Sequence, residues 1–354
     1  MTKYNELEQR LDSLMEAEVR RKNEKRQVIR ELFAQIKDIK DDLEARKTLF
    51  TKLQVLTDAG DMPENTLRGI LSKGWNLNHL PSFRALVTLD TCRRKIATNY
   101  SAWPLNDKGK AVQFIDMLDV PRPKVYEKAT TLSQINITSY PCIIKPLHGA
   151  TSSGVVIAFA ADRYRIVRNG TMLSHYAEVE KHLLKMLKVK SVSKDLWQIE
   201  EFIADIDRDA VRAARDLKFY CFYGKVGHVL EVEREKGGKF RTRYPDGTFA
   251  KGSEFEGDAE FPVTNFTPED IKLAERISKE IPVPFLSIDF LKTDDRMVFC
   301  EFTPRPGVYG QYKPEFDAYL GHLYLGAEAR LQKDFIRGKK FANYQAYLNA
   351  IKND

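Results

Sequence analysis

Residues 285–312 read FLSIDFLKTDDRMVFCEFTPRPGVYGQY and predict two apolar strands joined by a polar turn. Each strand carries one carboxylate among hydrophobic neighbours, Asp289 in the first and Glu301 in the second. A carboxylate in an apolar strand is costly unless something pairs with it, and a metal ion is one such partner. A turn with an odd number of residues would place the two acids opposite each other, whereas an even number would place them on opposite faces. The alternative is an edge hairpin whose acids line a solvated face.

A lysine and a glycine-containing loop occupy residues 140–159, YPCIIKPLHGATSSGVVIAF. Residues 142–144 predict a short buried strand that leads to Lys145, and a second strand is expected over 155–159. Between them, the small residues from Gly149 to Gly154 would expose backbone N–H groups that can cradle phosphate oxygens, and the lysine adds a positive charge. The lysine precedes the glycines, so this is not a P-loop, in which the lysine follows the glycines and opens a helix.

The order of lysine, loop and strand, followed far downstream by two acids on a hairpin, resembles the ATP-grasp enzymes. The resemblance rests on IIKPLHGATSSGVVI, SIDF and EFTPRPG together, and it covers residues 106–330. The motif EFT, followed by Pro-Gly and KPEFD, is similar to the TupA-like subgroup, which is associated with cell-surface polymer synthesis. The segments RDLK and GGKFRT are similar to parts of the RimK-like glutamate ligases. The resemblance implies an α/β (α+β) fold in which two α+β subdomains hold ATP and Mg²⁺ between them.

The resemblance also implies which residues hold the nucleotide. Lys145 matches one nucleotide lysine, and either Lys108 or Lys110 matches the other, with a solvated helix start as the alternative for Lys108. The main chain of a hinge strand would read the adenine edge, and a plain buried strand end is its alternative. The residues implied in this way are Lys108, Lys145, His148, Ser152, Ser153, Gly154, Glu200, Glu201, Ile203 and Asp216, of which Asp216 would face the ribose. We expect His148 to be a loop contact and not a proton acceptor.

Metal ligands and catalytic residues follow from the same resemblance. Asp289 and Glu301 match the two magnesium-binding acids, and Thr303 stands where the family usually has asparagine. A threonine hydroxyl can still bind Mg²⁺ or position a water, though less well than an amide oxygen. The residues expected near the transferred phosphate or the acyl phosphate are Lys218, Arg241 and Arg305. An exposed strand face is the alternative for Lys218, and a salt bridge to a neighbouring acid is the alternative for Arg305.

The composition favours an enzyme of the cytoplasm. The formal charge of +7 is a modest excess of 57 basic over 50 acidic residues, which suits anionic substrates but is no signature of nucleic-acid binding. The four cysteines lack zinc spacing, and we expect them to be reduced core residues. The first ten residues, MTKYNELEQR, lack the apolar core of a signal peptide, and no apolar run approaches the length of a membrane span.

The first 56 residues contain neither proline nor glycine and predict a long helical pattern. Leu7, Leu11 and Leu14 begin an apolar stripe that fades into charged residues between Glu16 and Gln27. A two-stranded coiled coil or a long helical hairpin fits this pattern. We expect an arm that forms a homodimer or docks on a partner, and a helix folded back on the catalytic body is the alternative.

Four regions are expected in the chain. Residues 1–56 would form the helical arm, 57–105 a short helical linker, 106–335 the ATP-grasp catalytic domain and 336–354 a C-terminal helical tail. The small subdomain would cover about 122–200. ATP-grasp enzymes commonly begin with a small α/β domain in front of the nucleotide site. Residues 57–105 are short for such a domain, so the residues that bind the acceptor stay unassigned.

Three functions are compatible with these residues. The first is a Mg-ATP-dependent carboxylate–amine ligase that acts through an acyl phosphate, with the addition of an amino acid to a cell-surface glycan or peptide as the finer expectation. The second is a phosphotransferase that uses the same nucleotide residues and a sugar or polysaccharide hydroxyl as acceptor. The third is a non-catalytic scaffold organised by its coiled coil, against which the presence of Lys145, Asp289 and Glu301 argues.

Overall fold

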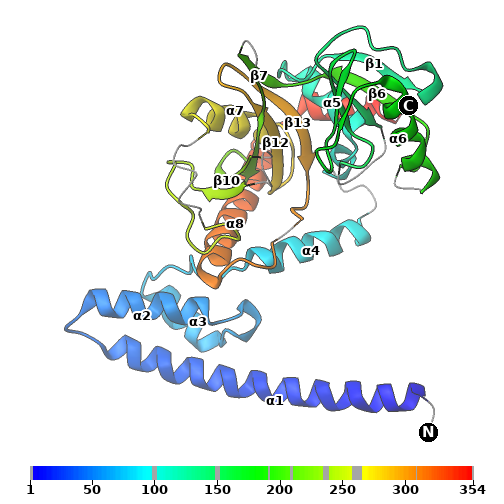
Figure 1. Ribbon diagram of the computed structural model, residues 1–354. Helices are drawn as coiled ribbons and strands as arrows, with labels where there is room; N and C mark the ends of the chain where they lie inside the picture. The colour runs from blue at the N-terminus through cyan, green and yellow to red at the C-terminus, as the bar shows by residue number, and fades with distance from the viewer. Residues whose placement is uncertain are drawn as a thin grey trace.

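A computed structural model describes residues 3–97, 102–147, 152–189, 192–207, 210–233, 239–256, 265–307 and 309–352. The first three helices lie beside one another below a larger body that contains two β-sheets (Figure 1). Helix α4, from Phe83 to Ile96, runs between these helices and the sheets and packs on helix α8, from Pro314 to Ile336. The predicted α+β class is therefore confirmed.

The N-terminal helices form a hairpin with a long exposed end. Their bounds are Lys3–Asp38 for α1, Leu43–Val55 for α2, Ala59–Asp61 for the 3-10 turn η1 and Glu64–Ser72 for α3. Asp42 caps α2, since its side chain accepts a hydrogen bond from the Ala45 amide at 2.8 Å. Ile29 and Phe33 of α1 pack against Phe50 of α2. The hairpin, one of the two predicted arrangements, leaves the start of α1 extending past α3 (Figure 1).

The first sheet carries the predicted lysine strand. Its strands lie in the order β1-β6-β2-β3-β4-β5, and all the pairs are antiparallel. Their bounds are Val125–Thr130 for β1, Cys142–Pro146 for β2, Val156–Ala160 for β3, Arg163–Ile166 for β4, Met172–Leu173 for β5 and Trp197–Glu201 for β6. Helix α6, Tyr176–Lys188, and the turn η3, Leu132–Gln134, belong to the same part of the chain. Ile144, Trp197 and Leu183 are fully buried between sheet and helix.

The second sheet carries the predicted acids. Its strands lie in the order β11-β10-β9-β12-β13. Their bounds are Arg215–Cys221 for β9, Val226–Glu233 for β10, Lys239–Arg243 for β11, Leu286–Lys292 for β12 and Met297–Thr303 for β13. Helix α7, Pro268–Lys279, packs on this sheet, and the hairpin of β7, Ala204–Asp207, and β8, Ala210–Ala213, connects the two sheets. The turn η2, Trp103–Asn106, leads to helix α5, Lys108–Met117, which packs on β13 and on the C-terminal helix α9, Ala342–Ala350.

A β-bulge decides how the two acids face each other. Lys292 pairs with Met297, so the turn between them has four residues, and an unbroken ladder would place Asp289 opposite Cys300. The register shifts by one residue between Asp289 and Phe290, and Glu301 thereby becomes the partner of Asp289. The extra residue of a bulge restores the pairing that an even turn would otherwise lose. The two acids therefore share one face of the sheet.

The cysteines do not all lie in the core as predicted. Cys142 and Cys221 are buried, whereas Cys92 and Cys300 are exposed. For Cys300 the physical reason is the bulge, which takes this residue out of the regular alternation of buried and exposed side chains.

None of the described helices is both long and apolar enough to cross a bilayer.

Candidate active site

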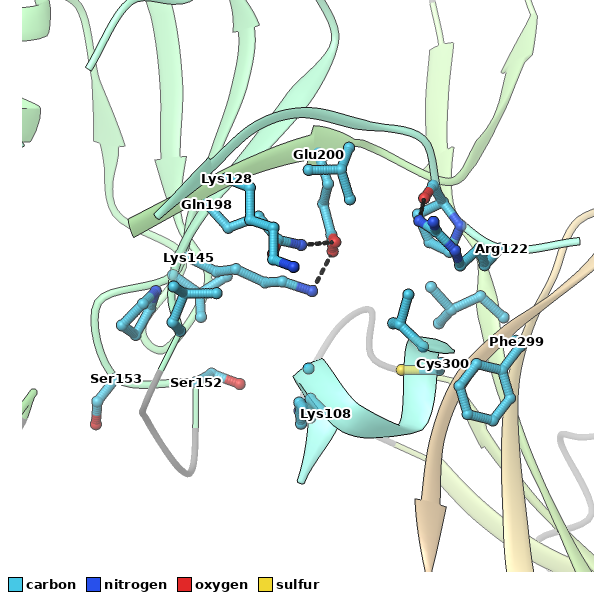
Figure 2. Close-up of a pocket in the computed structure, with 18 residues that line it drawn as sticks. Lys108, Arg122, Lys128, Lys145, Ser152, Ser153, Gln198, Glu200, Phe299 and Cys300 are labelled. Carbon is cyan, nitrogen blue, oxygen red and sulfur yellow. Dashed lines mark hydrogen bonds and ion pairs between the residues drawn. The ribbon is translucent and has the colours of Figure 1, made fainter. Parts of the chain in front are cut away.

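A cavity of about 320 Å³ lies between the two sheets and helix α5. The first sheet contributes Lys145, Gln198 and Glu200, α5 contributes Lys108, and the β12–β13 hairpin contributes Leu291, Phe299 and Cys300 (Figure 2). This volume falls within the range of small-molecule sites. Polar and charged side chains thus converge on one space from segments that are far apart in the sequence.

Lys145 is held in the cavity by Glu200. Lys145 lies opposite Gln198 in the ladder of β2 and β6, and Gln198 and Glu200 share a face because they are two residues apart. The Lys145 ammonium forms an ion pair with Glu200, and the Gln198 amide donates a hydrogen bond to the same carboxylate at 2.8 Å (Figure 2). A lysine held in this way presents its charge to the cavity before any ligand enters.

The end of the predicted phosphate loop also lines the cavity. Ser152 and Ser153 are among the lining residues, and the backbone of Ser152 has φ +56°. Gly154 has φ +73°, and a Cβ there would lie 3.0 Å from a methyl group of Val192 and 3.2 Å from the Trp197 ring. Glycine is therefore required by both the backbone and the packing. His148 and the residues from 149 to 151 lie outside the described part of the chain.

Two acids and one lysine form a row across three strands. Asp289 on β12 pairs with Glu301 on β13 and with Lys218 on β9, so all three side chains emerge on the same face. Lys218 forms an ion pair with Asp289, which also accepts a hydrogen bond from the Ser287 hydroxyl at 2.8 Å. Burial alone would lower the pKa of Lys218, but the Asp289 carboxylate outweighs it and raises that pKa. Lys218 therefore carries its positive charge at neutral pH.

Lys108 connects helix α5 to this row. Asp107 caps α5 by accepting a hydrogen bond from the Lys110 amide at 3.1 Å, which fixes Lys108 as the first helical residue. The Lys108 ammonium lies 2.8 Å from the Glu301 carboxylate. Burial raises the pKa of Glu301, but the charge and hydrogen bond of Lys108 act together with the charges of Lys218 and Lys145 and leave that pKa below its usual value. Of the two predicted lysines, Lys108 lines the cavity and Lys110 does not.

The row offers the oxygen ligands that a magnesium ion prefers. The carboxylates of Asp289 and Glu301 face each other across the strands, and the hydroxyl-bearing residues Ser287 and Thr303 form the neighbouring pair on the same face. Within the described residues, no cluster of three or more His, Cys, Asp or Glu side chains could bind a metal by itself. Mg²⁺ is usually held by one or two carboxylates together with substrate phosphates, and the donor set here fits that mode.

None of the three predicted catalytic residues is among the residues that line this cavity. Lys218 pairs with Leu230 of β10, and the β11 partner of Leu230 is the residue after Arg241. Arg241 itself pairs with Glu231, so its side chain lies on the opposite face of the sheet from Lys218. Its side chain is fully buried and lies over the Phe249 ring. Arg305 lines a separate small pocket beside α4. Of the three, only Lys218 stands in the row of acids.

Besides Gly154, three predicted nucleotide residues lie near the cavity without lining it. The Glu201 carboxylate pairs with Arg296 and accepts a hydrogen bond from the Lys124 amide at 3.1 Å. Ile203 is buried in an apolar cluster with Ala214. Asp216 is on the same face of β9 as Lys218, two residues away, and lies opposite Leu291, which lines the cavity.

The cavity also contains residues that sequence reasoning missed. Gln198, Arg122, Lys128 and Cys300 line it (Figure 2). Gln198 could have been found, because a residue two positions before Glu200 on a strand shares its face. Lys128 and Cys300 could not, because their positions depend on irregularities in the pairing of β1 and β13.

Comparison with known proteins gives one family and several distant structures. A family model described as TupA-like ATPgrasp matches residues 88–325. D-alanine–D-alanine ligase from Bacillus anthracis, complexed with ATP, is 13% identical over 66% of this chain and 69% of that chain, with a TM-score of 0.38. The ATP-grasp ligase PsnB, complexed with a minimal precursor, is 10% identical over 64% of this chain and 61% of that chain, with a TM-score of 0.37. No curated protein matches the sequence.

Proposed function

Because the chain belongs to the TupA-like ATP-grasp family, we propose that it is a Mg-ATP-dependent carboxylate–amine ligase that acts through an acyl phosphate. One observation carries the proposal. Lys145 from the first sheet and Lys108 from α5 line the same cavity, and Lys108 pairs with Glu301 in the row of acids on the second sheet. Cationic groups for a triphosphate and oxygen ligands for its metal ion thus meet in one place.

The nucleotide would lie along the cavity between the two sheets. Lys145 and Lys108 would contact its phosphates, and Ser152, Ser153 and Gly154 would close over them. The main chain around Glu200, Glu201 and Ile203 would read the adenine, and Asp216 would face the ribose. The placement of the phosphates is supported by Lys108, Lys145, Ser152 and Ser153, which line the cavity. The placement of the ribose is supported by the common face of Asp216 and Lys218 on β9.

The reaction has two steps in this proposal. A carboxylate oxygen of the substrate attacks the γ-phosphorus, the bond to the β-phosphate oxygen breaks, and ADP leaves. The amine nitrogen then attacks the acyl carbonyl, inorganic phosphate leaves, and the amine proton passes to solvent. Asp289, Glu301 and Thr303 would hold Mg²⁺, which neutralises charge on the phosphates when bound.

The residues of the chain provide the electrostatic help for these steps. Lys218, positively charged and adjacent to Asp289, would stabilise the phosphate during transfer. Arg305 follows Thr303 by two residues, and we propose it as a clamp for an anionic part of the acceptor. The placement of Arg241 on the opposite face gives no support to its predicted role at the acyl phosphate.

The acceptor is the finer part of the proposal. An amino acid joined to a cell-surface glycan or peptide is supported by the family alone. A kinase that transfers phosphate to a sugar or polysaccharide hydroxyl would use the same nucleotide residues, and product analysis separates the two. We also propose a cytoplasmic location, where ATP is available.

The direct test is product analysis with γ-labelled ATP and Mg²⁺, with pools of amino acids and sugars, with and without hydroxylamine. A ligase releases labelled phosphate from the acyl phosphate. It also forms a hydroxamate when hydroxylamine is present, because hydroxylamine traps the acyl group. Label in a stable phosphate ester would contradict the ligase and favour the kinase. Glu301→Gln should abolish product formation. Glu269→Gln on α7, which is an exposed acid outside the cavity, is the matched control and should leave it unchanged.

A further inference from the structure

One ion pair joins the two walls of the cavity. Glu201 ends strand β6 of the first sheet, directly after Glu200, which lines the cavity. Arg296 is the last residue of the turn between β12 and β13. Leu291 of β12 and Phe299 of β13 line the opposite wall of the cavity. The Arg296 guanidinium donates a hydrogen bond to the Glu201 carboxylate and so connects two different sheets.

Further hydrogen bonds hold both partners of this ion pair in place. Glu201 also accepts a hydrogen bond from the Lys124 amide at 3.1 Å, where β1 begins. The turn that carries Arg296 is closed by a hydrogen bond from the Thr293 amide to the Arg296 carbonyl at 2.9 Å. An ion pair between preorganised groups loses less side-chain entropy than a flexible surface pair, so it holds its geometry better.

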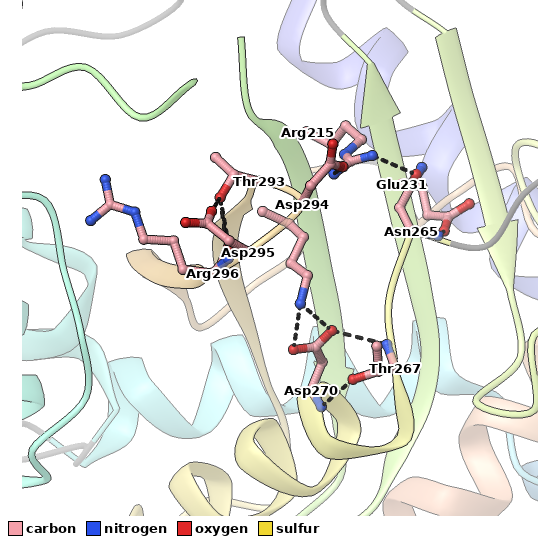
Figure 3. Close-up of polar contacts among 10 residues, drawn as sticks. Arg215, Glu231, Asn265, Thr267, Asp270, Thr293, Asp294, Asp295 and Arg296 are labelled. Carbon is pink, nitrogen blue, oxygen red and sulfur yellow. Dashed lines mark hydrogen bonds and ion pairs between the residues drawn. The ribbon is translucent and has the colours of Figure 1, made fainter. Parts of the chain in front are cut away.

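The turn is itself anchored to the second sheet. Asp294 pairs with Arg215 of β9 at 2.9 Å, and Lys292 pairs with Asp270 of α7 at 2.9 Å (Figure 3). The Arg296 side chain points away from Arg215 and Asp270 (Figure 3). Arg296 therefore transmits the position of the second sheet to the end of β6.

We propose that Arg296 and Glu201 are positioning residues that set the separation of the two cavity walls and thereby the affinity for the nucleotide. The inference rests on the proposed function, because it assumes that Mg-ATP occupies this cavity. Without the pair, the two sheets would sample more open arrangements, and only a fraction of molecules would hold both walls at the distance that the ligand needs. The apparent affinity falls by that fraction.

A charge-swap experiment tests this inference by isothermal titration calorimetry with Mg-ATP. Arg296→Glu and Glu201→Arg should each raise the dissociation constant by about 5-fold or more, the lower end of typical coupling between sites. The double variant, which recreates the pair with reversed charges, should recover most of the loss. Glu328→Arg is the matched control, because it breaks the Arg93–Glu328 pair between α4 and α8, whose exposure is similar.

The outcomes separate this inference from the proposed function. If the wild-type protein does not bind Mg-ATP, the proposed function fails. If it binds, and the single reversals bind as tightly as the wild type or the swap recovers nothing, the positioning role is contradicted. The thermal unfolding midpoint without nucleotide shows whether a reversal has only destabilised the fold. A purely structural pair would lower this midpoint, and the affinity of the folded protein would stay the same.

Discussion

Each lysine proposed to meet the nucleotide already has a carboxylate partner. The three pairs are Lys145 with Glu200, Lys108 with Glu301 and Lys218 with Asp289. A phosphate group would compete with these acids for the lysines, and a metal ion would compete with the lysines for Glu301 and Asp289. The paired charges keep the ligand-free site stable, since an unpaired charge at a partly buried position is costly.

The Lys108–Glu301 pair predicts a dependence of stability on pH. The pKa of Glu301 is lowered by Lys108, so its contribution is present above the ordinary value of 4.5 and is lost as the pH falls through the lowered pKa. The pKa of Lys108 is raised against burial by Glu301, so its contribution is present below 10.5 and is lost as the pH rises through the raised pKa. The pair should therefore stabilise the fold between these limits.

Lys108→Met measures this effect by urea unfolding across the pH range. The difference in unfolding free energy from the wild type should be constant near neutral pH and should shrink below pH 4.5. Lys110→Met, on the same helix, should show no such pH-dependent difference. A Lys108→Met difference that stayed constant down to the acid limit would contradict the pairing.

At the scale of elements, helix α5 depends on its N-cap. Asp107→Ala removes the acceptor for the Lys110 amide and should lower the unfolding free energy by about 1 kcal/mol. Because the cap fixes the first helical residue, nucleotide binding through Lys108 should weaken as well. Denaturant unfolding measures the stability change, and Asp107→Ser, which keeps a capping oxygen, should recover most of it. Equal stability of the Ala and Ser variants would show that the cap is unimportant.

The β12–β13 hairpin shows how far the sequence could predict this site. The strands, the turn and the two acids follow from local pattern, because apolar runs and turn residues are local signals. The facing of Asp289 and Glu301 did not follow, because it depends on a bulge at Cys300 that the sequence does not mark. Arg241 was placed in the site by motif, but the pairing of β10 and β11 puts it on the other face. Long-range register, which is set by packing of whole sheets, is what local patterns cannot supply.

At the scale of the molecule, the start of α1 exposes an apolar stripe. Leu7, Leu11 and Leu14 are 52%, 60% and 59% exposed, and their spacing of four and three residues is that of a coiled-coil seam. In a parallel pair with these leucines at the seam, Lys3 of one copy would face Glu8 of the other. We therefore propose a parallel homodimer through this helix.

Light scattering tests the dimer. Replacing Leu11 and Leu14 together with Glu should convert a dimer into a monomer, because charged residues at the seam oppose pairing. The same variant should retain its fold, since both side chains are exposed. Gln9→Glu, on the same helix away from the seam, should remain dimeric. An unchanged mass for the double variant, or a monomeric wild type, would contradict the proposal.

The measurement that tests the central claim most directly is calorimetric titration of Mg-ATP into the wild-type protein and into Lys145→Met. The wild type should bind one nucleotide per chain, and Lys145→Met should bind about tenfold or more weakly, as expected for loss of a charged hydrogen bond. Lys272→Met, which alters an exposed lysine on α7, should bind like the wild type. Absence of binding by the wild type, or equal affinity of Lys145→Met, would show that the cavity between the two sheets is not the nucleotide site.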